Sequence, residues 1–387
     1  MSEWKKVRIG DVAQIYDGPH ATPPPCEKSD AYFLGIPHIT PSGHIDLTQP
    51  RYIAERDYAK WTKRVVPTVG DVVFSYEATL NLYARIPRDL KCCLGRRMGL
   101  VRPDGNKLND SFLYYYFFSE EWRKTVRIKT INGATVDRLP IADFPDFEIS
   151  LPPLATQRRI TSILSNYDSA IANCRRQIAL LEEAAMRLYK ECFKDGKGEK
   201  KKIGEVCECV LGGTPNRAKP EYWGGNVAWI NSGKVNELRI VEPSEYITEL
   251  GLRKSAAKMM PRHTTVLAIT GATLGQVSLL EIDSAANQSV VGVLENENLH
   301  YEFIYPLIVD NIRKLIMHQT GGAQQHICKD DVLNFEVHIP NKGELKKYGE
   351  LARPMFEQIS ELFFTIRALA EARDRLLPKL MKGEIAV

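Results

Sequence analysis

The residues of this sequence best suited to chemistry lie in short, glycine-containing loops. Residues 211–217, LGGTPNR, form a sharp turn that carries a hydroxyl, an amide and a guanidinium. Residues 270–275, TGATLG, follow a β-rich run, and their glycines let backbone N–H groups approach a phosphate closely. Residues 320–325, TGGAQQ, add two amides that can pair bidentately with adenine edges. Together these loops predict a surface that binds a polar ligand.

The first half of the chain has comparable loops at 18–25, 76–85, 95–97 and 132–135. Arginine is the commonest reader of guanine and also a common phosphate clamp, so Arg96 and Arg97 suit either role. Any single loop is better explained as an ordinary turn, but their recurrence at matched places in two halves favours a shared ligand surface. The residues that we expect to contact the ligand are Thr22, Tyr76, Thr79, Arg85, Arg96, Arg97, Asn132, Thr135, Thr214, Asn216, Arg217, Lys234, Thr270, Thr273, Gln288, Gln324 and Gln325.

Catalytic motifs are missing from the sequence. It has no GxxxxGKS or GxxxxGKT phosphate loop, no HExxH, no GxSxG and no His/Cys/Cys zinc pattern. It also lacks the Asn- or Asp-Pro-Pro-aromatic tetrad with which an adenine amino-methyltransferase holds its target amine, and its eight histidines are scattered. We therefore expect no catalytic, cofactor or metal site on this chain. An enzyme of two lobes with an unrecognised site stays open as an alternative.

Two long heptad patterns must position the loops. In 151–193, apolar residues recur at alternating steps of four and three, which is the period of a helix that lays a narrow stripe on a partner helix. This first seam comprises Ile160, Leu164, Tyr167, Ile171, Cys174, Ile178, Leu181, Ala185, Leu188 and Cys192. The second comprises Ala352, Met355, Ile359, Leu362, Ile366, Leu369, Leu376 and Leu380. Either seam alone fits a core-facing helix, but two of matched length favour a pair of long helices.

An internal repeat sets the order of domains. Ile9–Val12 returns at Ile203–Val206, and Phe147–Ile149 returns at Phe335–Val337, at offsets of 194 and 188 residues. The prediction is a mixed α+β fold, with two similar globular domains at opposite ends of an antiparallel pair of long helices and a pseudo-twofold repeat. The predicted segments are a first globular domain, a long helix, a second globular domain and a second long helix, at 1–153, 154–196, 197–341 and 342–387.

Within each globular domain we expect short strands joined by turns, and one helix each at Asp110–Val126 and Tyr301–Ile316. The run of five aromatics at 114–118 cannot face one way on a helix, so we assign most of it to the core rather than to base stacking. The lysine-rich segment 194–202 is interpreted as a solvated linker.

Composition places the chain among reduced, cytoplasmic proteins. It has 387 residues, 44% hydrophobic and 26% charged, without an apolar run of membrane length or a hydrophobic signal core. Its eight cysteines form no CxxC pair. A net charge of +4 permits nucleic-acid binding without requiring it.

These features together resemble the specificity subunit of Type I restriction–modification systems. The resemblance covers essentially the whole chain, and its sharpest parts are 151–154, LPPL, with Gln157, and 373–385, RDRLLPKLMKGEI. Loops 212–215 and 270–273, with Asn287-Gln288, resemble the second target-recognition domain of that family. The first half departs more, because residues 77–81 lack the flanking glycines and Thr156 stands where an acidic residue is usual.

The resemblance implies a non-catalytic subunit that binds double-stranded DNA. Each globular domain would recognise one half of a bipartite, asymmetric target, through the loop residues named above. The helix pair would fix the spacer and dock two methyltransferase subunits. S-adenosylmethionine, ATP and Mg²⁺ would then be bound by the methyltransferase and the restriction/translocase subunits, and none by this chain. Pairing with a fused nuclease–methyltransferase is a close variant, and a coiled-coil adaptor with two ligand-binding end domains is the alternative from another class.

Overall fold

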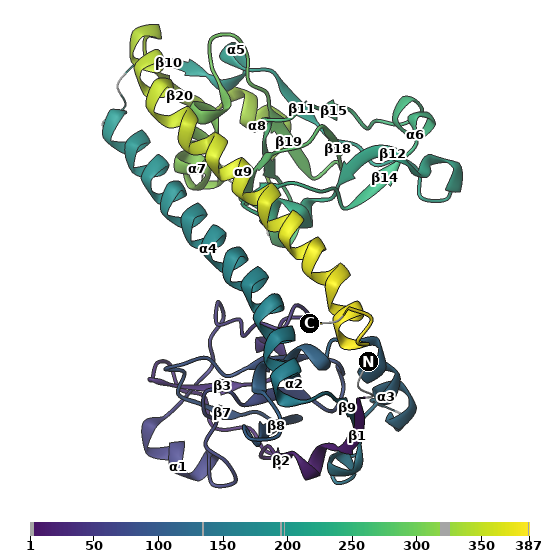
Figure 1. Ribbon diagram of the computed structural model, residues 1–387. Coiled ribbons are helices and arrows are strands. Elements are labelled where there is room, and N and C mark those ends of the chain that lie inside the picture. Colours follow the sequence, from purple (N-terminus) through teal and green to yellow (C-terminus); the bar gives the residue numbers. More distant parts are fainter. Residues whose placement is uncertain (1–3, 134, 194–195, 197, 318–325, 386) are drawn as a thin grey trace. The chain divides into compact units, whose positions relative to one another are not determined.

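The chain forms two compact units (Figure 1). The structure is a computed structural model that describes residues 4–133, 135–193, 196, 198–317, 326–385 and 387. Unit 1 consists of residues 1–169 and 369–387, and unit 2 of residues 170–368. Two long helices, α4 (Leu154–Cys192) and α9 (Lys342–Met381), are each divided between the units. Both units mix helices and sheets, as predicted.

Unit 1 contains two small sheets and a strand pair. The first sheet has the order β2 (Ala13–Asp17), β8 (Met98–Pro103), β5 (Val72–Ser75) and β6 (Tyr83–Arg85), all antiparallel. The second has the order β4 (Tyr52–Ile53), β3 (Ala31–Leu34) and β7 (Cys92–Leu94), with β3 and β7 parallel. Strands β1 (Lys5–Arg8) and β9 (Glu148–Leu151) pair separately. The short helices are α1 (Tyr58–Trp61), α2 (Asp110–Tyr116) and α3 (Glu120–Lys129).

Unit 2 repeats this plan. Its first sheet has the order β11 (Cys209–Leu211), β19 (Val290–Val293), β16 (Thr265–Ala268), β17 (Val277–Leu280) and β13 (Arg239–Ile240). Its second has the order β14 (Glu245–Ile247), β12 (Trp223–Ile230), β18 (Ser284–Ala286) and β15 (Met259–Met260). Strands β10 (Glu199–Lys202) and β20 (Glu336–Ile339) form the separate pair. The short helices are α5 (Ile203–Val206), α6 (Glu249–Arg253) and α8 (Lys329–Asn334), and α7 (Tyr301–Met317) is longer.

The internal repeat is confirmed by strand order and direction. The order β2-β8-β5-β6 matches β11-β19-β16-β17, and in the second sheets β4-β3-β7 matches β14-β12-β18. The pair β3–β7 is parallel, and so is its counterpart β12–β18. Because strand pairing is a backbone property, the plan repeats even where the two halves share few side chains.

The long helices pack on each other within each unit. In unit 1, Ile160 and Leu164 near the start of α4 share a core with Leu380 at the end of α9. In unit 2, Ala185 near the end of α4 shares a core with Phe356 from the first half of α9. In both units, an early part of one helix therefore meets a late part of the other, which is the antiparallel arrangement that the seams predicted. Of the first seam, Cys192 is exposed.

The start of α4 is fixed by a buried amide. Gln157 is fully buried, and its Oε1 accepts from the N–H of Asn109 at 2.8 Å. Its Nε2 donates to the carbonyls of Pro152 at 2.9 Å and Lys107 at 3.1 Å. Asn109 in turn caps α2 by accepting from the N–H of Phe112. One side chain thus joins the helix entry to the neighbouring helix of unit 1.

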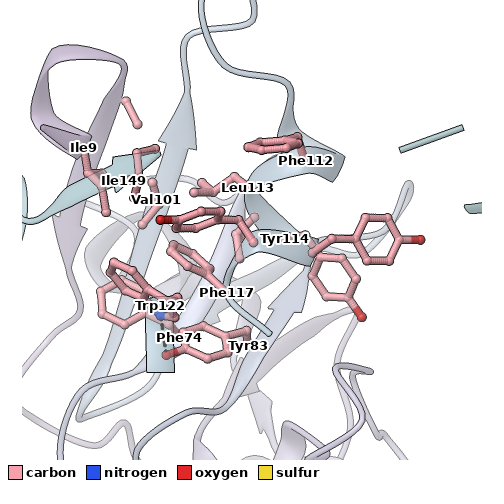
Figure 2. Close-up of a cluster of buried hydrophobic side chains, with 14 of the residues drawn as sticks. Ile9, Phe74, Tyr83, Val101, Phe112, Leu113, Tyr114, Phe117, Trp122 and Ile149 are labelled. Atoms are coloured by element: carbon pink, nitrogen blue, oxygen red, sulfur yellow. Dashed lines mark hydrogen bonds between the residues drawn. The ribbon is translucent and has the colours of Figure 1, made fainter. Parts of the chain in front are cut away.

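The core of unit 1 is aromatic (Figure 2). The buried Trp122 indole N–H donates to the hydroxyl of Tyr83 at 2.8 Å, and the Trp122 ring lies 4.7 Å from that of Phe117. Tyr114 to Phe117 are buried, so the assignment of most of the aromatic run to the core is confirmed. Burial raises the pKa of Tyr114 to about 12, and hence these phenols stay neutral.

Two sequence predictions about local structure are wrong. The expected single helix at 110–126 is two helices, α2 and α3, because Ser119 adopts an extended backbone and caps α3 by accepting from the N–H of Trp122 at 3.2 Å. The expected linker 194–202 includes strand β10, which pairs with β20; Lys200 forms an ion pair with Glu336 at 2.5 Å. Strand pairing uses backbone groups, and lysines are tolerated on an exposed strand. The helix predicted at 301–316 is confirmed by α7.

Candidate nucleic-acid interface

Three of the predicted loops in unit 2 meet at one end of the first sheet. The N–H of Gly212 donates to the carbonyl of Val290 at 3.0 Å, so the loop after β11 lies beside the β18–β19 turn. The N–H of Ile269 donates to the carbonyl of Ser289 at 2.9 Å, which brings the loop after β16 to the same turn. Loops 211–217, 270–275 and 287–289 therefore form one continuous edge.

The loops of unit 1 meet in the same way. The N–H of Gly18 donates to the carbonyl of Met98 at 2.9 Å, and the N–H of Tyr76 donates to the carbonyl of Arg97 at 3.2 Å. These two bonds match the two in unit 2 strand for strand. A third pair also matches, since Leu139 bonds Tyr76 at 2.7 Å and Ile327 bonds Ile269 at 2.9 Å, each from N–H to carbonyl. The backbone thus builds the same loop cluster twice.

Within the cluster of unit 2, hydrogen bonds and contacts link several of the predicted residues. Thr214 Oγ1 donates to Gln288 Oε1 at 2.5 Å, so a hydroxyl and an amide from two loops are joined. Thr273 Oγ1 donates to the carbonyl of Thr270 at 3.4 Å inside the turn Gly271–Thr273. Lys234 lies on the neighbouring turn Ser232–Asn236, which contacts that turn.

Two predicted cations of unit 2 are held by carboxylates. Lys234 forms ion pairs with Glu237 at 2.7 Å and with Glu242 at 3.6 Å, and only 15% of its side chain is exposed. Arg217 donates to both carboxylate oxygens of Glu245 at 2.7 Å, and its guanidinium lies 3.5 Å from the centre of the Trp223 ring. The hydrogen bonds from Arg217 hold the pKa of the Glu245 carboxyl below its usual range.

Asn216 precedes Arg217 and shapes its turn. Its Oδ1 accepts from the N–H of Ala218 at 2.9 Å, and its carbonyl accepts from the indole N–H of Trp223 at 3.4 Å. The turn and the aromatic ring beneath Arg217 are thereby fixed together. The Arg217 guanidinium is held in one plane by the Trp223 ring and by two hydrogen bonds to Glu245. Such a fixed plane suits recognition of a flat polar ligand group that takes the place of the Glu245 carboxylate.

In unit 1, Arg96 and Arg97 differ sharply. Arg96 is exposed, with no bonded partner among the described residues. Arg97 has a positive φ of 71° and forms an ion pair with Glu77 at 2.9 Å. Arg96 is the residue after Gly95, as Gln288 is the residue after Asn287, and both Gly95 and Asn287 donate their N–H to the end of a parallel strand. Arg96 and Gln288 are therefore the corresponding positions of the two units.

Tyr76 lies deeper than predicted. It is 5% exposed, and its hydroxyl donates to Asp17 Oδ1 at 2.9 Å. Burial, followed by this bond, raises the pKa of Tyr76 well above its usual range. The structure thus places its ring in the core of the loop cluster and leaves the hydroxyl bound within the protein.

The other predicted residues of unit 1 lie on or near the surface. Arg85 forms a hydrogen bond with Ser111 and stacks at 5.4 Å on Tyr114. The exposed members are Thr22, Thr79, Asn132 and Thr135. Backbone β-bridges join Ile131 to Arg138 and Arg138 to Glu77. They bring Ile131, which precedes Asn132, close to the loop after β5. Gln324 and Gln325 lie outside the described residues.

Sequence reasoning missed the acidic partners and the aromatic support. Glu77, Glu245 and Asp17 each hold a predicted residue, and Trp223 supports Arg217. The spacing of these pairs along the chain carries no signal, since the members lie on different strands. Among the described residues, no three His, Cys, Asp or Glu side chains are grouped as metal ligands. No described helix has both the length and the apolar character of a membrane span.

Comparisons with known proteins agree with this geometry. A family model for the Type I restriction modification DNA specificity domain matches residues 1–183 and again residues 196–358. The specificity subunit of the Type I restriction enzyme MjaIX from Methanocaldococcus jannaschii is 24% identical, and the alignment covers 100% of this chain and 94% of that protein. The EcoR124I/EcoR124II specificity subunit from Escherichia coli is 24% identical, over 72% of this chain and 71% of that protein.

A solved structure shows the same fold. The crystal structure of the S subunit of a Type I restriction–modification system from M. genitalium superposes with a TM-score of 0.57 at 14% identity, over 97% of this chain and 96% of that one. The family model covers most of the present sequence, in two successive matches. The chain therefore belongs to the Type I restriction modification DNA specificity family and carries two copies of its domain.

Proposed function

We propose that this chain is the DNA-reading subunit of a Type I restriction–modification complex, and that each unit recognises one half of a bipartite, asymmetric target. The observation that carries the proposal is the duplicated loop cluster, in which matching backbone hydrogen bonds hold matching loops in both units. The two clusters present different side chains, Arg96 in one and Gln288 in the other. Two similar loop clusters that carry different side chains suit a target whose two halves differ in sequence.

The chemistry of the loops fits base reading. An arginine fork can bond the O6 and N7 of guanine, and an amide can bond the N6 and N7 of adenine. Arg96 is exposed and lacks a partner among the described residues, so it is available for such a contact. Gln288 already accepts from Thr214, and this bond orients its amide. We infer that the remaining loop residues contact the phosphates of the DNA and so position the duplex against the protein.

In this proposal the chain is non-catalytic and binds no cofactor. Two methyltransferase subunits supply S-adenosylmethionine chemistry, and restriction/translocase subunits bind ATP and Mg²⁺. The complex acts in the cytoplasm, where the DNA lies. The long helices α4 and α9 set the distance between the two loop clusters, so that the spacer length of the target follows from helix length. About one turn of B-DNA, or 34 Å, is the natural unit of such a distance.

The direct test maps methylated adenines in host DNA with and without this gene. A bipartite motif that appears only with the gene supports the proposal. Its absence, in the presence of the methyltransferase partner, would overturn it. Insertion of one heptad into both α4 and α9 should change the spacer length or abolish assembly, while leaving the two half-site sequences unchanged.

The same methylation map distinguishes the proposed function from the main alternative, an adaptor. If the chain were an adaptor whose end domains bind peptides or glycans, deletion of the gene would leave adenine methylation unaltered. Duplex binding by the purified complex would then show no salt dependence of the kind that phosphate contacts produce.

A further inference from the structure

A pocket in unit 1 opens beside the loop that follows β2, the predicted loop 18–25, but the segment on its other side was not predicted from the sequence. It has a volume of about 360 Å³. Helix α1 and the residues after it form one wall, and the loop forms the other. We refer to it as the basic pocket, and its polar lining is Asp17, His20, Lys60, Trp61, Lys63 and Arg64.

Asp17 is the one carboxylate in this lining, and its oxygens are already bonded. Its Oδ1 accepts from the hydroxyl of Tyr76 at 2.9 Å, and its Oδ2 lies 2.8 Å from His20 Nε2 and 3.3 Å from Arg64 Nη1. Arg64 Nη1 also donates to the carbonyl of Gly18 at 2.8 Å. Asp17 and Arg64 therefore hold the two walls together.

Three further groups of the basic pocket can donate to a ligand, and the Lys60 ammonium lies 5.9 Å from the centre of the Trp61 ring. Lys60 and Lys63 are exposed and form no ion pair among the described residues. The indole N–H of Trp61 is buried and likewise has no hydrogen-bond partner among them. Buried donors are nearly always bonded in folded proteins. Since Trp61 lines the pocket, its unbonded N–H is free to donate to a ligand that displaces the groups shielding it. Two ammonium groups and an indole N–H together select an anionic oxygen ligand.

The internal repeat has basic residues at the equivalent place in unit 2. Lys254 and Lys258 lie 194 residues after Lys60 and Arg64, although Lys60 lies within α1 and Lys254 directly follows α6. The backbone of 256–257 lies so close to Gly213 that a Cβ there would come within 2.6 Å of it. In both units, the segment that follows the short helix thus lies beside the first loop and carries basic residues.

We propose that the basic pocket binds a phosphodiester of the DNA backbone, with Lys60 and Lys63 as the charge donors and the Trp61 N–H as a directed hydrogen-bond donor. This inference rests on the proposed function and assigns the phosphate contact of unit 1. The pocket fixes the register of the duplex against the loops, because phosphate contacts position a protein without reading sequence. Unit 2 has Ser255 in place of Trp61, so its contact depends on the lysines alone.

The test uses the full chain and a random-sequence duplex of about 30 base pairs, with binding measured by fluorescence anisotropy from about 50 to 250 mM NaCl. The double variant Lys60→Gln/Lys63→Gln should bind roughly tenfold more weakly at low salt, and its plot of log affinity against log salt should be shallower by about 1 to 2. Lys5→Gln/Lys6→Gln on β1 removes the same charge elsewhere in unit 1 and is the matched control. Equal slopes for the two double variants would overturn the proposal.

A second measurement follows Trp61 itself. The Trp61→Phe variant identifies the indole N–H resonance of Trp61 by its loss, and that resonance should shift downfield when the duplex is added to the wild type. A resonance unmoved at saturating duplex would also overturn the proposal. Both readouts use non-specific binding, so they do not depend on a recognised sequence. If the proposed function is wrong, the methylation map shows no bipartite motif. If the map shows the motif but the two double variants give equal slopes, only the assignment of the pocket is wrong.

Discussion

The two units share a backbone plan and both pack apolar side chains on the long helices, but unit 2 adds a fully buried ion-pair network to this contact. In unit 1, aromatic and aliphatic side chains around Trp122 belong to one core with residues of α4 and α9. Figure 2 shows the aromatic side chains around Trp122 in this core. In unit 2, the attachment includes Arg239, which is fully buried and forms ion pairs with Glu182 of α4 and with Glu281. Glu281 also accepts from Ser360 of α9 at 2.7 Å.

Unit 1 also has an ion pair between the helices, but it is more exposed. Asp168 of α4 accepts from Arg373 of α9 at 2.6 Å and from the hydroxyl of Tyr115 at 2.5 Å, with 25% of its side chain exposed. In unit 2 the corresponding figures are 0% for Arg239 and 12% for Glu182 of α4. The comparison teaches that strand pairing was kept between the repeats, while each helix contact uses its own side chains. The buried ion pairs of unit 2 require a cation and carboxylates at matching places, whereas apolar packing is not directional.

Removing the buried cation should have the largest effect. Arg239→Met leaves Glu182 and Glu281 buried with one cation fewer, and breaking a buried pair in this way costs about 3–5 kcal/mol. Urea unfolding measures the loss, and hydrogen exchange should place it in unit 2. The matched control is Arg262→Met, because Arg262 pairs with the same Glu281 at 3.2 Å but is 49% exposed. We expect about 1 kcal/mol or less for the control. Equal losses would show that burial does not distinguish the two arginines.

A substitution in the loop cluster of one unit should change the base preference of one half-site and leave the other half-site unchanged. Arg96→Ala is expected to relax one base position in one half-site by about 1–3 kcal/mol, and Gln288→Ala should do the same in the other half-site. Methylation mapping of each variant reads both half-sites in one experiment. Arg97→Ala is a useful control, because Arg97 is paired with Glu77 and should alter the preference less. If either variant changed both half-sites together, the two loop clusters would not be independent readers.

Much of this architecture was predictable, because it depends on periodic or repeated features. The heptad seams predicted α4 and α9, and matching segments at fixed offsets predicted the repeat. The break between α2 and α3 was not predictable from apolar spacing, since the aromatic residues continue across it. Strand β10 was hidden by its lysines, which suit a linker as well as an exposed strand.

The positions of the loops were predictable from the sequence, but whether each loop side chain has an ion-pair partner was not. Arg96, Arg97 and Arg217 look alike in the sequence, and the structure leaves one unpaired among the described residues and pairs the others with Glu77 and Glu245. These partners lie on other strands or turns, and tertiary distances are not encoded by local spacing. The basic pocket could not be predicted either. Its two walls come from segments about 40 residues apart, and the sequence does not show that they lie together.

The half-exposed pair of unit 1 should contribute less to stability. Asp168→Asn keeps an acceptor for Tyr115 but removes the charge that faces Arg373, so we expect a loss of about 1 kcal/mol in the free energy of unfolding. Added salt should reduce this difference, because screening acts on exposed pairs more than on buried ones. Hydrogen exchange should place the loss in unit 1. A loss as large as that of Arg239→Met would remove the distinction between the two attachments.

The last prediction concerns pH, and its sign tests whether burial or ion pairing dominates the pKa of Glu182. Burial raises the pKa of the Glu182 carboxyl, and Arg239 opposes this only in part. A raised pKa means that the folded state favours the protonated form. Its contribution to stability is therefore complete below the ordinary carboxyl pKa of about 4.3 and is lost as the pH rises through the raised value.

Glu182→Gln removes this titration while keeping the shape of the side chain. The difference in unfolding free energy between wild type and variant should consequently fall as the pH rises from about 4 to 7, by about 1.4 kcal/mol for each unit by which the pKa is raised. Urea unfolding at several pH values measures it. If the difference instead grew with pH, attraction to Arg239 would outweigh burial, and the attachment of unit 2 would depend on charge pairing at neutral pH.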